Sequence, residues 1–288
     1  MLPVVIVILV VLAATAALYA RWRLRYRYPP PGIPQVLCYH KLSSRFCWEG
    51  TWTTPKRFFA AIDRLLDHGY CFIGEDEYLS VPDEDGGAPG RLFLTFDDGY
   101  AGVRSVAFDG LCARGVPFHV FLVSDYAGRP NDWDLGLGRR PFFHATWDEA
   151  REMALAGVTF GSHGASHRDL TKLPAERVRD ELERSKRTIE GELGRAVRTV
   201  SYPFGRYDDV VRAAAAAAGY EAGFSLYPRH PNDRVDRFAL RRNGVYIIDG
   251  ARTVEAKLRR HRWFWFEEMK CRSINGVAVL TPLLKTRS

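Results

Sequence analysis

Two adjacent carboxylates, Asp97 and Asp98, end an apolar run in the sequence LTFDDGY, residues 94–100. The run before them, RLFLTF, has the composition of a strand that is buried on both faces. Like charges at a poorly solvated strand end repel each other, and a nearby cation would relieve that repulsion. The Asp-Asp-Gly triplet could also be an ordinary turn, so partners elsewhere in the chain must decide between the two interpretations.

Two histidines could supply such partners. His163 and His167 follow the β-like run VTFGS and have three residues between them. This spacing allows both imidazoles to face one ion, and with Asp98 they would form a His-His-Asp ligand set. Three protein ligands leave a coordination position open, which is typical of a catalytic metal site rather than a structural one. Asp97 would then be free to act as a base on the attacking water.

The motifs TFDDG and SHGASH together resemble those of the polysaccharide deacetylases, the NodB-type carbohydrate esterases, over residues 35–245. The resemblance implies that Asp97 is the general base. It also implies that Asp98, His163 and His167 bind one divalent metal, which is often zinc in that family, although other divalent ions are possible.

A third family motif, Arg-Pro-Pro-Tyr-Gly, is similar to SYPFG at residues 201–205. Phe204 stands where the family has a tyrosine whose backbone N–H helps to hold the oxyanion, and a backbone donor survives that change. Ser201 stands where the family has an arginine that orients the base. We expect Arg242, or else Arg241, to take over this role, because a guanidinium offers two donors to a carboxylate. Both arginines could equally be surface charges on an edge strand.

The stretch PQVLCYHKL predicts a strand that ends at His40. It is similar to the opening of the biofilm poly-N-acetylglucosamine deacetylases, whose motifs are circularly permuted, and this resemblance implies that His40 is the general acid. The alternative is a strand-end histidine bonded to a loop carbonyl. Trp133 lies in a segment rich in Gly, Pro and Arg, residues 128–141. It could stack on a sugar, or pack on the body of the protein.

The remaining sequence predicts strands alternating with helices. Capping residues and apolar spacing predict helices near residues 54–69, 146–157, 174–194 and 208–219, of which 174–194 carries many opposite charges, typical of a solvated face. Strands are expected at residues 117–123, 198–202, 221–226 and 245–248. This alternation predicts an α/β barrel. The family resemblance narrows it to a distorted (β/α)7 barrel.

The amino-terminal residues 2–20 contain no charged side chain. As a helix they would span about 28 Å, enough to cross a bilayer core, and they are predicted to be a retained transmembrane helix. The chain is thus divided into an anchor at 1–20, a basic, Pro-rich linker at 21–34, a deacetylase domain at 35–250 and a basic aromatic tail at 251–288. The tail could lie on anionic lipid or form a plain helix that closes the barrel.

The charge distribution argues against nucleic acid as a partner. Residues 21–28 carry +4 and residues 251–288 carry +6 of a net charge of +7, so the central body carries −3. The excess of basic residues therefore lies in two end segments of the sequence and does not indicate a basic face that binds nucleic acid. Four arginines directly after the predicted span favour a single-pass protein whose catalytic domain faces the cytoplasm over an exported one.

These observations predict an enzyme that hydrolyses the N-acetyl group of an N-acetylhexosamine-containing polysaccharide or lipid-linked glycan and releases acetate. Its expected partners are that glycan and membrane lipid. The alternative is a membrane-anchored glycan-binding or assembly protein whose deacetylase site has decayed. The complete set of two aspartates and two histidines favours the enzyme, whereas the missing arginine favours decay.

Overall fold

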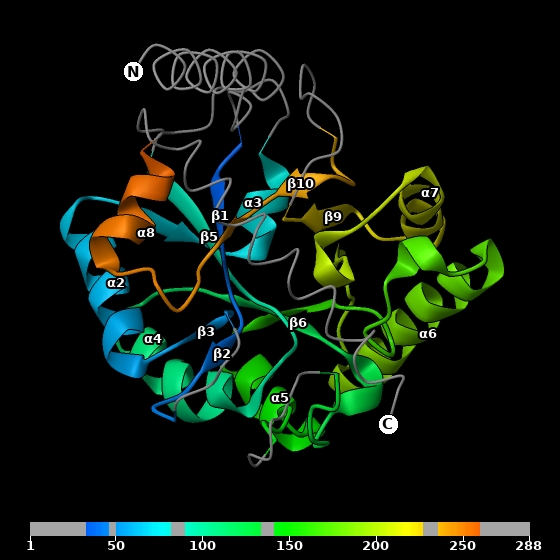
Figure 1. The fold of residues 1–288 in the computed structure, drawn as a ribbon, viewed down its shortest axis with the longest axis horizontal. Helices are drawn as coiled ribbons and strands as arrows, with labels where there is room; N and C mark the ends of the chain where they lie inside the picture. Colours follow the sequence, from blue (N-terminus) through cyan, green and yellow to red (C-terminus); the bar gives the residue numbers. More distant parts are fainter. Residues whose placement is uncertain (1–32, 46–49, 82–89, 134–140, 227–235, 260–288) are drawn as a thin grey trace, which may run out of the picture.

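A parallel sheet curls around the centre of the protein into a nearly closed barrel (Figure 1). The computed structural model describes residues 33–45, 50–81, 90–133, 141–226 and 236–259. The six longer strands of the barrel path are β1 (Gln35–Tyr39), β5 (Arg91–Phe96), β6 (His119–Leu122), β7 (Thr159–Ser162), β8 (Thr199–Ser201) and β9 (Ala222–Ser225). β4 (Cys71–Ile73) adds to the start of β5, and β2 (Lys41–Leu42) pairs with β3 (Trp52–Thr53) in a small separate sheet.

One short segment bridges the two ends of this sheet. β10 (Leu240–Arg241) pairs with β9, and β11 (Asn243–Gly244) pairs with β1. Only Arg242 separates β10 from β11, so residues 240–244 act as the seventh strand of the barrel path. The predicted distorted (β/α)7 barrel is thereby confirmed in the described residues.

The strand predicted at residues 245–248 is wrong. Val245 still donates its N–H to Cys38 O at 2.9 Å, but Ile247 donates to Gly50 O instead, at 2.9 Å. The chain therefore leaves the sheet after Val245, and the strand lies a few residues earlier. The apolar run was misleading because Tyr246 is buried against the barrel although, among the described residues, it makes no hydrogen bond to β1.

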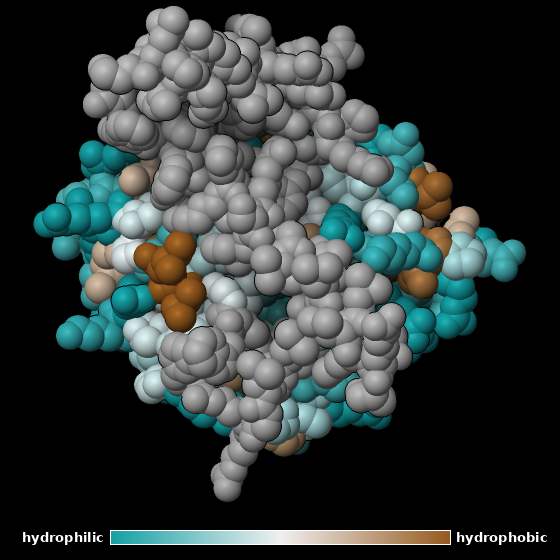
Figure 2. All heavy atoms as spheres, viewed as in Figure 1, coloured by the Kyte–Doolittle hydropathy of each residue, from teal (hydrophilic) through white to brown (hydrophobic). Residues whose placement is uncertain are grey.

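Helices cover the outside of the barrel, and the four predicted ones are present. The helices are α2 (Pro55–Asp67), α3 (Glu75–Ser80), a π-helical turn (Val103–Phe108) that leads into α4 (Asp109–Cys112), α5 (Trp147–Leu155), α6 (Ala175–Leu193), α7 (Asp209–Ala217) and α8 (Ala251–Leu258). Thr54 caps α2, and Thr146 with Glu149 forms a capping box on α5. Such caps satisfy N–H groups that a helix start leaves unpaired. Around the rim of the molecule the surface is mainly hydrophilic (Figure 2).

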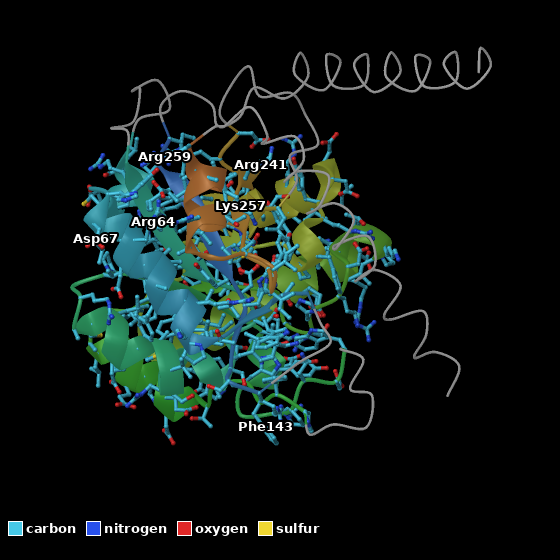
Figure 3. All side chains as sticks on the ribbon, turned by 60° about the vertical axis from the view of Figure 1, so that its left-hand side comes forward. Arg64, Asp67, Phe143, Arg241, Lys257 and Arg259 are labelled. Atoms are coloured by element: carbon cyan, nitrogen blue, oxygen red, sulfur yellow. The ribbon has the colours of Figure 1, made fainter. Side chains whose placement is uncertain are left out.

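The first residues of the predicted tail form α8, which packs on α2. Glu255 of α8 accepts hydrogen bonds from Arg64 of α2 and from His68, which directly follows α2, at 2.6 and 2.7 Å. Figure 3 shows Arg64 and Arg259 on the side of the protein where α2 and α8 lie. The outer layer of the barrel thus extends beyond residue 250.

No helix among the described residues is long and apolar enough to cross a membrane. The predicted span at 2–20, the linker up to residue 32 and the tail from residue 260 lie outside the described residues.

Aromatic rings fill the inside of the barrel. Phe93, Phe121 and Phe224 are fully buried, and Tyr78 stacks on Phe93 at 4.7 Å between ring centroids. The guanidinium of Arg242 lies over the rings of Phe121 and Phe224, at 5.3 and 5.9 Å from their centroids. These rings fill the interior at close packing. The polar groups at the carboxyl ends of the strands therefore have little room to move.

A buried carboxylate lies apart from these strand ends. Glu75, at the start of α3, accepts a hydrogen bond from Thr199 Oγ1 at 2.9 Å, and the ring of His119 contacts the same hydroxyl at 3.0 Å. Burial raises the pKa of Glu75 to about 7, although the Thr199 hydroxyl opposes that effect. The folded protein therefore binds a proton at Glu75 that the unfolded chain releases near its ordinary pKa of 4.5.

We expect Glu75→Gln to stabilise the protein increasingly as the pH rises from about 5 to about 8, because ionisation of Glu75 favours the unfolded chain over that interval. At acid pH the Glu75 carboxyl is protonated in both the folded and the unfolded protein, so the stability gain of Glu75→Gln disappears. Above pH 7 this gain should be on the order of 3 kcal/mol. Urea unfolding of both proteins across this range measures it. Glu77→Gln, on the exposed face of the same helix, is the control, and a stability difference for Glu75→Gln that is constant with pH would contradict the prediction.

Candidate active site

The two aspartates sit at the carboxyl end of β5, and their backbone turns between them. Asp97 still follows the sheet, since its N–H donates to Tyr39 O at 2.9 Å. Asp98 has a φ of 67°, in the left-handed region that side chains other than glycine rarely adopt. This turn sends the two neighbouring carboxylates to different partners.

Asp97 forms a buried two-donor ion pair with Arg242. Arg242 Nη1 donates to Oδ1 at 2.6 Å and Nη2 donates to Oδ2 at 2.7 Å. The Ser201 hydroxyl lies between them, 3.2 Å from Asp97 Oδ2 and 2.8 Å from Arg242 Nη2. Burial alone would raise the pKa of Asp97, but the Arg242 guanidinium outweighs it and holds that pKa well below its usual range. Asp97 is therefore a fixed, ionised carboxylate.

Asp98 faces the two predicted histidines. Its Oδ1 lies 3.3 Å from His163 Nε2 and 3.2 Å from His167 Nε2, and it is buried without a hydrogen bond. Burial alone would raise the pKa of Asp98, but the two imidazoles outweigh it and lower that pKa well below its usual value.

The hydrogen bonds around this cluster fit a metal ion. His163 Nδ1 lies 2.7 Å from Ser201 O, which can only accept, so Nδ1 carries a proton. Burial alone would lower the pKa of His163, but the carboxylates of Asp97 and Asp98 outweigh it and raise that pKa. The pocket thus favours a positive charge between His163 Nε2 and Asp98, and in the neutral ring Nε2 and the carboxylate oxygen are two acceptors that face each other. Asp98, His163 and His167 each offer one ligand atom, and these atoms lie within 4.8 Å of one another. A cation between these acceptors would relieve their opposition, and this donor set suits zinc.

His40 follows β1 and lies beside Asp97. Its Nε2 is 3.9 Å from Asp97 Oδ2, and its Nδ1 is 3.9 Å from Cys38 Sγ. No carbonyl bond of this ring, the alternative considered above, is found among the described residues. Burial lowers the pKa of His40, and the nearby carboxylates oppose that effect only in part. The His40 ring is therefore close enough to Asp97 to take up or release a proton beside that carboxylate.

Phe204 and Trp133 both lie against His167. Phe204 has a φ of 60°, and its ring centroid is 4.8 Å from that of His167. Trp133 stacks on the imidazole at 4.2 Å with a 19° angle between the planes. Trp133 therefore packs on the ligand set, and its contact with a sugar stays a prediction.

Sequence reasoning missed His144, which contacts the turn that carries Asp98. His144 donates its Nδ1–H to Asp98 O at 2.7 Å and stacks on Tyr100, while its buried Nε2 has no hydrogen-bond partner in the described part of the chain. Ala145 N–H also donates to Gly99 O at 2.8 Å, so this segment pins the strained turn. An isolated histidine just before a helix cap gives no spacing signal that could have revealed this contact.

Sequence comparisons connect this site to known proteins. The model of the family described as polysaccharide deacetylase matches residues 85–223. YxkH of Bacillus subtilis (strain 168), described as a candidate polysaccharide deacetylase, is 26% identical over 215 residues, which cover 74% of this chain and 71% of that protein.

Solved structures share the fold. IcaB from Ammonifex degensii superposes with a TM-score of 0.66 at 24% identity, over 80% of this chain and 97% of that one. The deacetylase PplD of Streptococcus pyogenes, in complex with acetate, superposes with a TM-score of 0.64 at 20% identity, over 80% of this chain and 99% of that one. The family match and the relative from Bacillus subtilis place the chain in the polysaccharide deacetylase family, hydrolases that act on amide bonds, and the solved structures show that it shares their fold.

We expect Arg242→Ala to lower the free energy of unfolding by about 3–5 kcal/mol, because it leaves the buried Asp97 carboxylate without its counter-charge. The double variant Arg242→Ala with Asp97→Asn should lose clearly less than the sum of the two single changes. Urea unfolding of the four proteins measures this coupling.

Arg241→Ala is the matched control for that cycle, since Arg241 precedes Arg242 in the chain and it is Arg242 that meets Asp97. Its effect should add to that of Asp97→Asn within about 0.5 kcal/mol. Equal coupling energies for the two arginines would contradict a specific role of Arg242.

Proposed function

We propose that this protein is a metal-dependent deacetylase that hydrolyses the acetamide of an N-acetylhexosamine in a polysaccharide or a lipid-linked glycan and releases acetate. The observation that carries the proposal is the separation of the two neighbouring carboxylates. Asp97 is held by Arg242 and Asp98 faces two histidines. One carboxylate is thereby available for proton transfer while the other is available to a cation.

Asp98, His163 and His167 would hold the divalent metal, with zinc as the ion that suits them. When bound, such an ion polarises a carbonyl and makes water a better nucleophile. The residues of this chain account for the remaining steps. Asp97, ionised and fixed by Arg242, accepts the proton of the attacking water.

The backbone N–H of Phe204 would donate to the oxygen that becomes negative as the acetamide carbon turns tetrahedral. His40 then protonates the nitrogen of the departing amine. Its lowered pKa suits a relay, since a neutral His40 can take up a proton released near Asp97, 3.9 Å away, and pass it on. Trp133 could cover one face of the sugar beside His167.

The alternative, a binding or assembly protein with a decayed site, rested on the missing arginine at position 201. Arg242 reaches the carboxylate that such an arginine would orient, and Ser201 bonds to both partners. A decayed site has no need of a buried, charge-paired Asp97. The enzyme is therefore the better supported function.

Acetate release tests the function directly. Purified full-length protein is incubated with N-acetylglucosamine oligomers and with lipid-linked N-acetylated glycans, once with added Zn²⁺ and once with a chelator. We expect acetate from at least one substrate class with metal and none with chelator. Binding of the glycans without acetate release under any of these conditions would favour the decayed-site alternative.

We expect Asp97→Asn and His40→Ala to fold and to retain metal but to lose about two or more orders of magnitude in kcat/KM, because each removes one proton-transfer group. Acetate release and metal content are measured on the same samples. His68→Ala, at the histidine that directly follows the outer helix α2, is the control and should remain active. Near-normal turnover by His40→Ala would return His40 to a structural role.

We further propose that residues 2–20 anchor the protein in the membrane and that the barrel faces the cytoplasm. The support is the sequence, in which four arginines follow the apolar run within eight residues. Carboxyl-terminal fusions to a reporter that is active only in the cytoplasm, and to one that is active only after export, measure the orientation. Signal from the export-dependent reporter alone would move the substrate to a secreted or cell-wall polysaccharide.

A further inference from the structure

Helix α6 carries a buried carboxylate that its sequence does not reveal. The dense opposite charges of this helix are typical of a solvated face, and most of them are exposed or half-exposed. Glu181 differs, since only 4% of its surface is accessible. A carboxylate is almost never buried to this extent without partners that repay its lost hydration.

The hydrogen-bond partners of Glu181 all belong to the turn between the two predicted histidine ligands, and Arg184 on the same helix adds an ion pair, with its Nη2 3.6 Å from Glu181 Oε1. Its Oε2 accepts the backbone N–H groups of Ala165 and Ser166, at 3.1 and 2.9 Å. Its Oε1 accepts the Ser166 hydroxyl at 2.6 Å. The residues that Glu181 binds are therefore the ones that set the relative position of His163 and His167.

This turn needs such support because its backbone is unusual. His167 has a φ of 55°, a conformation that costs free energy for a residue with a side chain and persists only where neighbours enforce it. Without Glu181, the N–H of buried Ala165 and the N–H of half-buried Ser166 would lose the acceptor that they have in the fold.

The carbonyl side of the turn is held separately. Ser185, also on α6, donates its hydroxyl to Gly164 O at 3.0 Å, and Asp125 N–H donates to Ala165 O at 3.0 Å. Glu181 is thus the acceptor for the amide side, while neighbouring groups supply donors to the carbonyl side. Both the N–H groups and the carbonyl groups of the turn are therefore bonded, and Glu181 is the charged side chain that accepts from its N–H groups.

We propose that Glu181 is a positioning residue for the metal site, which holds the turn so that His163 and His167 converge with Asp98 on one ion. The inference rests on the proposed metal dependence. Glu181 does not contact the ion in this account. It acts through the two backbone amides, so its removal should loosen the ligand geometry more than it disturbs the barrel.

Metal affinity is the readout that separates this role from a purely structural one. Competition of the full-length protein with a chromophoric chelator for Zn²⁺ gives the Kd of wild type, Glu181→Ala, Glu181→Gln and Glu183→Ala. We expect Glu181→Ala to weaken binding by about 10–100-fold, the usual effect of losing a group that orients metal ligands. Glu181→Gln should remain much closer to wild type, because its amide oxygen can still accept the two N–H groups.

Glu183→Ala removes a carboxylate of the same helix that does not bind the turn, and its Kd should equal that of wild type. The absorption spectrum of the Co²⁺-loaded proteins gives a second readout, since altered ligand geometry shifts the visible bands of Glu181→Ala but not of Glu183→Ala. If Glu181→Ala fails to fold, Ser166→Ala removes the 2.6 Å contact alone and should still weaken metal binding severalfold.

The outcomes distinguish the two proposals. A wild type that binds no divalent metal would overturn the metal dependence itself. A wild type that binds metal, with Glu181→Ala binding equally well and showing only a lower melting temperature of the metal-free protein, would overturn the positioning role and leave the metal site intact. If Glu181→Gln and Glu181→Ala weakened Zn²⁺ binding equally, the negative charge of Glu181 would set the affinity. Its hydrogen bonds to the turn would not, and the positioning role would be overturned.

Discussion

The buried ion pair between Arg242 and Asp97 is the contact on which the arrangement of the site depends. A carboxylate at the centre of a barrel is costly unless a counter-charge satisfies both of its oxygens, and the guanidinium does so with two short bonds. Arg242 also separates β10 from β11, the segment that completes the barrel. Closure of the fold and orientation of the proposed base are therefore achieved by the same residue.

This pairing explains how two adjacent aspartates can be assigned to different chemistry. Because Arg242 already balances the charge of Asp97, the proposed ion would balance the charge of Asp98 alone. The left-handed turn at Asp98 moves that carboxylate toward the histidines, and His144 bonds to its carbonyl from the other side. Both proposed ligand turns are thus strained, and both are held by side chains outside the ligand set.

Local patterns in the sequence were sufficient for the elements and for the residues that the family motifs mark. Apolar periodicity and caps located the helices, and the spacing of His163 and His167 placed two imidazoles beside Asp98. Contacts between segments that are far apart in the sequence were harder to predict. That Arg242 rather than Arg241 reaches Asp97 depends on where the strand ladder ends, and the apolar run after it suggested a later strand. Glu181 gave no signal, because a charge on an amphipathic helix looks the same whether it meets water or a buried turn.

Metal content of three site variants tests the division of roles between the two carboxylates most directly. Wild type, Asp97→Asn, Asp98→Asn and His163→Ala are purified, equilibrated with Zn²⁺ and freed of loosely bound ion before elemental analysis. The account predicts about one metal per chain in wild type and in Asp97→Asn, and a loss of tightly bound metal in Asp98→Asn and His163→Ala. Loss of metal in Asp97→Asn with retention in Asp98→Asn would contradict it.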